Sequence, residues 1–138
     1  MNKIAQLKGL LLVSLFIFLF TGCEKDNLTI LTDGVWQFEN FTTTSDNDDI
    51  RSLVALGKAI MTDGTLTFSD DGSYTLDSPI IDPETGSYEL VGSTQLIFND
   101  GIARTASIDE ISKKKLVYIE TYLYLDVTTY SVKYVWVR

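Results

Sequence analysis

Residues 65–77, which read TLTFSDDGSYTLD, show most clearly the repeated pattern from which the fold can be predicted. Apolar and polar residues alternate on both sides of Asp71-Gly72, which is the pattern of two half-buried strands joined by a tight turn. Gly72 can adopt the positive φ that such a turn requires. Each strand carries two apolar side chains on one face, namely Leu66 and Phe68 on the first and Tyr74 and Leu76 on the second. The segment therefore predicts a β-hairpin.

The same alternation continues in both directions from this hairpin. Towards the N-terminus it places Trp36, Phe38 and Asn40 on one face of the run from Val35 to Thr43. Towards the C-terminus, turn residues separate further runs at 87–91, 94–99, 102–109, 116–125 and 128–137. About eight short strands joined by short links predict an all-β domain. Such an antiparallel meander loses its exposed edges by closing into an up-and-down barrel.

One segment has helical spacing instead. Asp46-Asn47-Asp48-Asp49 supplies residues that cap helix N-termini, and apolar residues follow at intervals of three and four from Ile50 to Met61. This predicts a short amphipathic helix between the first two strands, flanking one mouth of the barrel. Because the last two runs are apolar on both faces, as at Val117 and Tyr118, we also expect this helix to cover their outer face.

The N-terminus has the regions of an export signal. Lys3 and Lys8 precede an apolar run from Leu10 to Phe20, which is shorter than the roughly 20 residues of a membrane-spanning helix. We therefore interpret the chain as three parts: a signal peptide (1–22), a lipidated cysteine with a polar tether (23–31), and a folded domain (32–138).

The end of the apolar run, Leu19-Phe20-Thr21-Gly22-Cys23, resembles the lipobox of bacterial lipoproteins, in which the cysteine is linked to diacylglycerol. Phe20 stands where that motif usually has leucine. The resemblance implies that Cys23, the only cysteine, carries several acyl chains and anchors the protein stably in the bacterial cell envelope. We expect the anchor in the outer membrane, with the periplasmic or the surface face left open. The alternative is an unmodified, buried cysteine.

Composition excludes several classes of function. The chain has no histidine, and lipidation would consume its one thiol, so Ser-His and Cys-His hydrolases are excluded. Without the leader, 9 basic and 19 acidic residues leave a formal charge of −10, which disfavours nucleic-acid binding. We expect no metal and no cofactor. A hydrolase that uses two carboxylates roughly 5–9 Å apart stays open.

Gly34-Val35-Trp36 on the first strand resembles the G-x-W signature of lipocalins. Several further residues follow in the order seen in lipocalin-like lipoproteins of some Gram-negative bacteria: Leu31, Gly34 and Trp36, then Asp71-Gly72, then Gly86 and Tyr88. The resemblance covers most of residues 31–138. It implies an eight-stranded barrel in which Trp36 closes one end, with Arg138, or as the weaker choice Lys133, lying over its ring.

Seven aromatic residues are candidates for lining the inside of this barrel: Phe38, Phe68, Tyr74, Tyr88, Phe98, Tyr118 and Tyr122. If they surround a cavity, their rings and hydroxyls suit a small apolar or amphipathic ligand. If they fill the barrel, they are an ordinary core, which a short barrel favours. Glu120 lies among apolar neighbours at the centre of a strand. If it is buried, its pKa is raised and it can contact a ligand.

The leading hypothesis is therefore an envelope binding module for a small apolar or amphipathic ligand, attached to the membrane by its lipid. The alternative is a protein-interaction module with a filled barrel, such as an inhibitor or an envelope-accessory subunit. An accessible cavity near residues 44–63 favours the first. An exposed apolar patch on the last hairpin or on the helix favours the second.

Overall fold

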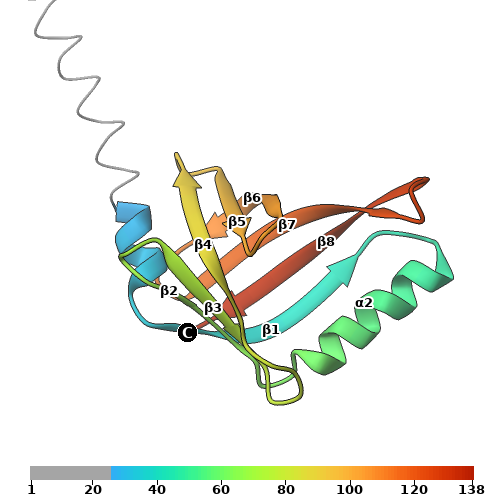
Figure 1. The fold of residues 1–138 in the computed structure, drawn as a ribbon, viewed down its shortest axis with the longest axis horizontal. Helices are drawn as coiled ribbons and strands as arrows, with labels where there is room; N and C mark the ends of the chain where they lie inside the picture. Colours follow the sequence, from blue (N-terminus) through green and yellow to red (C-terminus); the bar gives the residue numbers. More distant parts are fainter. Residues whose placement is uncertain (1–25) are drawn as a thin grey trace, which may run out of the picture.

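A computed structural model describes residues 26–138, which form a closed barrel of eight antiparallel strands in sequence order (Figure 1). The strands are β1 (Val35–Thr43), β2 (Thr65–Phe68), β3 (Ser73–Asp77), β4 (Glu84–Val91), β5 (Gln95–Asn99), β6 (Ala103–Ile111), β7 (Lys115–Tyr124) and β8 (Thr128–Val137). Helix α2 (Asp48–Ile60) joins β1 to β2. The up-and-down barrel with one short helix between its first two strands is thus confirmed. The predicted signal peptide and Cys23 lie outside the described residues.

The strands of the barrel differ in length. β7 and β8 have 10 residues each and β1 and β6 have 9, whereas β2 has only 4 and β3 and β5 have 5. The four long strands are neighbours, because β8 pairs with both β1 and β7, and β7 pairs with β6. β1, β7 and β8 extend beyond the short strands, and α2 lies beside this extension (Figure 1). The barrel has a closed end next to residues 26–32 and a wide end next to α2.

Local chemistry explains why α2 begins where it does. The Asn47 side chain accepts hydrogen bonds from the backbone N–H groups of Asp49 (2.9 Å) and Ile50 (3.1 Å), which satisfies two donors that the first helical turn leaves free. Asp48 and Asp49 place negative charge at the positive end of the helix dipole. Ile50 is fully buried. The predicted helix is therefore present.

The expected position of the helix over the outer face of the last hairpin is wrong. Leu123 and Leu125 on that hairpin are 58% and 73% exposed. The helix lies instead beside the inward-facing side chains of the hairpin, where Leu53 shares a cavity wall with Tyr122 and Tyr130. The link from β1 to α2 spans only residues 44–47, so the helix stays close to the end of β1.

A β-bulge in β1 changes which side chains enter the barrel. The pairing with β8 shifts between Phe38 and Asn40, so that Phe38 opposes Trp136 and Phe41 opposes Tyr134. One extra residue reverses the inside–outside alternation of the strand that follows it. The expectation that Asn40 shares the face of Trp36 and Phe38 is therefore wrong, and Phe41 takes the inner position.

The closed end is built around Trp36, which is fully buried. The Arg138 guanidinium lies over its ring, 3.6 Å from the centroid, and the indole N–H donates to the carbonyl of Leu31 at 3.0 Å. Arg138 also donates to the carbonyls of Ile30 and Asp33. The contact implied by the resemblance for Trp36 and Arg138 is therefore present, whereas Lys133 pairs with Asp109 at 2.9 Å.

The folded unit begins before residue 32. Residues 26–32 are helical, and Leu31 is fully buried within the hydrophobic core. Leu31, the last residue of the expected tether, therefore packs with the barrel core. Leu31 stays in place because its carbonyl accepts the Trp36 hydrogen bond while its side chain fills the closed end.

Candidate ligand-binding site

A cavity of about 160 Å³ lies inside the barrel. Its apolar wall comes from six strands and from the residue that caps the C-terminus of α2: Phe41, Met61, Leu66, Tyr74, Leu76, Phe98, Tyr118, Tyr134 and Trp136. Glu84, Arg104 and Glu120 complete the wall. The barrel is therefore not filled completely by its own side chains. A second cavity, of about 130 Å³, lies beside α2 and shares Phe41 and Tyr134 with the first.

The structure divides the seven predicted lumen residues into two groups. Tyr74, Phe98 and Tyr118 line the main cavity, and Tyr122 lines the second. Phe38, Phe68 and Tyr88 line neither. These three side chains pack in the core instead. The Phe68 and Tyr88 rings meet edge to face with centroids 4.9 Å apart, and the Phe38 and Trp136 rings do the same with centroids 5.8 Å apart. The Tyr88 hydroxyl donates to the Ser69 carbonyl at 2.9 Å and so supports the β2–β3 turn.

Sequence reasoning missed several wall residues. Phe41 could not be found, because nothing in the sequence marks the bulge that turns it inward. Arg104 carried a usable signal, since it precedes Ala106 and Ile108 at period two and so stands on the apolar face of β6. Tyr134 and Trp136 had the same signal on β8. Glu84 was missed because β4 begins three residues before the predicted run.

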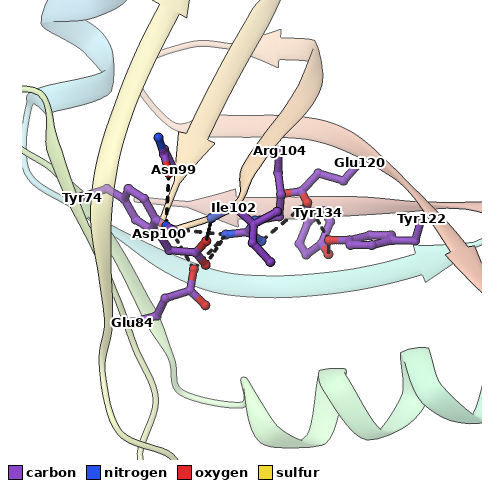
Figure 2. Close-up of polar contacts among 10 residues, drawn as sticks. Tyr74, Glu84, Asn99, Asp100, Ile102, Arg104, Glu120, Tyr122 and Tyr134 are labelled. Atoms are coloured by element: carbon purple, nitrogen blue, oxygen red, sulfur yellow. Dashed lines mark hydrogen bonds and ion pairs between the residues drawn. The ribbon is translucent and has the colours of Figure 1, made fainter.

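Arg104 is the centre of a polar network that crosses the cavity wall (Figure 2). Its guanidinium lies 2.8 Å from Glu84, 3.3 Å from Asp100 and 3.6 Å from Glu120. Tyr74 donates to Glu84 at 2.8 Å, and Arg104 donates to the Tyr74 hydroxyl at 3.2 Å. Burial disfavours the charged guanidinium, but the nearby carboxylates outweigh this and raise the pKa of Arg104. The buried Nε–H of Arg104 has no hydrogen-bond partner among the described residues.

Glu120 is the buried acid of this network, with only 4% of its surface exposed. It points inward from β7 because it pairs with Ala106 on one side and Val132 on the other, and both are buried. The Tyr122 hydroxyl donates to its Oε2 atom at 2.6 Å. Burial raises the pKa of Glu120, and the hydrogen bond from Tyr122 and the charge of Arg104 offset this only in part.

Tyrosines surround this acid. The hydroxyls of Tyr122 and Tyr134 are hydrogen-bonded to each other, and the Tyr134 ring stacks on Tyr118 with centroids 4.9 Å apart. Burial raises the pKa of all three phenols, so they stay neutral near pH 7. The site therefore combines flat apolar surfaces, neutral hydroxyls, three carboxylates and one guanidinium.

The raised pKa of Glu120 gives a testable dependence of stability on pH. A carboxyl whose pKa is higher in the folded state favours folding fully below its unfolded value, near 4.5, and loses this contribution as the pH rises through the folded value. The neutral near-isostere Glu120→Gln is therefore expected to increase the free energy of unfolding near pH 7 and to leave it nearly unchanged below pH 4.5. Urea unfolding across this pH range measures the difference.

The exposed strand position Glu89 supplies the control, and Glu89→Gln should change stability little at either end of the range. A destabilised Glu120→Gln variant near pH 7 would show that the Arg104 contact outweighs the cost of burying the charge.

Within residues 26–138, no group of three or more acidic, histidine or cysteine side chains is arranged to hold a metal ion. No helix in this part of the chain combines the length and the apolar character that crossing a membrane requires.

Comparison with known proteins agrees with this geometry. The model of a family described as a lipocalin-like domain matches residues 32–118. This match covers the strands from β1 to β6 and the first part of β7. No curated protein matches the chain.

Proposed function

The chain belongs to the lipocalin-like domain family, and from that premise we propose that it binds a small, partly apolar ligand inside its barrel, as a lipid-anchored protein of the bacterial cell envelope. The observation that carries the binding role is the cavity of about 160 Å³ with its aromatic wall and buried polar groups. A barrel that served only as a scaffold would be expected to fill this space, because voids larger than a water molecule are few in protein interiors.

The size of the cavity limits the ligand. An engineered protein cavity of about 150 Å³ holds one benzene molecule, whereas sites for drug-sized ligands enclose about 300–1,000 Å³. The ligand, or the part of it that enters the barrel, is therefore close to a single ring in size. Joining the second cavity, through movement of Phe41 and Tyr134, would admit a longer molecule.

Export and anchoring rest on the N-terminal sequence, which ends its apolar run at Cys23. The described chain starts with residues 26–32 at the closed end of the barrel (Figure 1). A lipid on Cys23 would hold that end near the membrane. The wide end, with α2, would then be free to face the solution.

The position of Arg104 supports binding over hydrolysis. A hydrolase of the two-carboxylate type needs its acids to face each other across the substrate. Here Glu84 and Glu120 are both held by the same guanidinium, which lies 2.8 Å and 3.6 Å from them. The guanidinium occupies the place where a substrate bond would lie.

One observation favours a second candidate function. The tip of the β7–β8 hairpin exposes three apolar side chains, Leu123, Leu125 and Val127, by 58%, 73% and 82%. Exposed apolar surface of this kind often contacts another protein. An interaction role for the hairpin is compatible with a ligand in the barrel.

Native mass spectrometry of the chain, extracted gently from its own host, tests the binding proposal. We expect a small non-covalent adduct in addition to any covalent lipid. Leu76→Phe adds volume at the cavity wall and is expected to remove the adduct, at a cost in stability of about 1–3 kcal/mol from overpacking. The same substitution at exposed Leu123 is the matched control and should keep the adduct. A wild-type protein without an adduct, even after incubation with host extract, would favour the interaction role.

A further inference from the structure

The cavity is more acidic than a barrel for neutral or anionic ligands would be. Glu84, Asp100 and Glu120 all lie within 3.6 Å of Arg104. The cavity wall itself holds Glu84, Glu120 and Arg104, a formal charge of −1 when all three are ionised. Asp100, which pairs with Arg104 from outside the wall, brings the network to −2. Because its charge is already compensated from three sides, Arg104 has little attraction left for an anion that enters from solution.

Glu120 has one oxygen that the protein does not use. Its contacts with Tyr122 and Arg104 are both made by Oε2, and no hydrogen bond from the described residues reaches Oε1. The side chain lines the cavity and is 4% exposed. Oε1 is therefore free to accept a hydrogen bond from a ligand in the cavity, and a charged donor would make a stronger bond with it than a neutral one.

The walls around this acid are aromatic. Four aromatic residues line the cavity: Phe41, Tyr118, Tyr134 and Trp136. The Tyr134 ring connects two of them, because Phe41 meets it edge to face with centroids 4.4 Å apart and Tyr118 stacks on it with centroids 4.9 Å apart. The faces of aromatic rings attract cations, and groups of such rings are a usual way to hold ammonium groups.

We propose that the cavity selects a small organic cation, in which a protonated amine contacts Glu120 and an apolar or aromatic body fills the space between the rings. This proposal rests on the proposed small-ligand function and names the chemistry of the ligand. A carboxylate ligand of the same size would meet Glu84 and Glu120 with like charge. A neutral ligand would leave Oε1 of Glu120 with a weaker partner.

Three probes of one size separate these possibilities: benzylammonium, benzyl alcohol and benzoate. The full chain in detergent is titrated with each at mildly alkaline pH, where benzylammonium is still charged and Glu120 is more fully ionised. The indole N–H signal of Trp136, a wall residue, reports binding by NMR. The indole N–H of Trp36 lies at the closed end and is the internal control. We expect benzylammonium to bind about tenfold more tightly than benzyl alcohol, and benzoate to bind most weakly.

Variants assign the selectivity to Glu120. Glu120→Gln is expected to reduce benzylammonium binding to the level of benzyl alcohol, and the benzyl alcohol binding that remains shows that the cavity is still present. Glu89→Gln removes one negative charge from an exposed strand position and should preserve the tenfold preference. If the preference survives Glu120→Gln, the assignment to Glu120 is wrong.

The other outcomes are distinct from one another. Equal binding of benzylammonium and benzyl alcohol, or tightest binding of benzoate, would overturn cation selection and leave the small-ligand function standing. If none of the three probes shifts the Trp136 signal, the binding role of this cavity fails together with its selectivity.

Discussion

Trp36→Ala is expected to lower the free energy of unfolding by about 3–5 kcal/mol, the usual cost of removing a large buried aromatic side chain. We expect the loss to fall in the upper part of this range because Trp36 makes two specific contacts in addition to its packing. Its indole N–H donates to the Leu31 carbonyl at 3.0 Å, and its ring supports the Arg138 guanidinium at 3.6 Å. The cavity left behind would loosen residues 26–32 and β8 at once. Urea unfolding followed by far-ultraviolet circular dichroism measures the loss.

Val35→Ala is the matched control for Trp36→Ala. Val35 is the neighbouring residue on β1 and is 45% exposed, so its truncation should change stability by less than about 0.5 kcal/mol. If Trp36→Ala costs as little as this control, the closed end does not depend on the Trp36–Arg138 contact.

Gly86→Ala is expected to cost about 1–3 kcal/mol through overpacking and to weaken ligand binding. A methyl group on Gly86 would clash with the backbone oxygen of Asn99 and would lie 2.8 Å from the Tyr74 ring. The first contact can be relieved only by moving β5 away from β4, because Asn99 pairs with the neighbouring residue Ser87. The second displaces Tyr74, whose hydroxyl donates to Glu84 at the cavity wall. Thermal unfolding and titration with benzyl alcohol measure the two effects.

The same substitution at Gly57 should have the opposite effect on stability. Gly57 lies within α2, and an added methyl group would meet only the Phe41 ring, at an ordinary contact distance of 3.8 Å. Alanine in a helix interior is favoured over glycine by up to about 1 kcal/mol, so Gly57→Ala is expected to stabilise the protein. If both variants behave alike, the close approach at Gly86 is not what limits that position.

Much of the fold could be predicted because its signals are local. The alternation in residues 65–77 and the capping residues before Ile50 are short-range patterns, and each element that they predict is present. The Trp36–Arg138 contact could be anticipated only through the family resemblance, since the two residues are about one hundred positions apart in the chain. Phe41 was missed at the site because an extra residue in a strand leaves no signature in the alternation, whereas Arg104 and Tyr134 carried a usable period-two signal.

Local patterns in the sequence were enough to place the strands and α2, to predict that the strands close into a barrel, and to show that no histidine is present for catalysis. The side chains that face the cavity became known only from the folded barrel, because they depend on the register between strands. The bulge in β1 turned Phe41 inward, the pairing of β7 with β6 and β8 buried Glu120, and the closed end took Leu31 into the core. Each of these outcomes is set by a partner distant in sequence, and no local pattern carries that information.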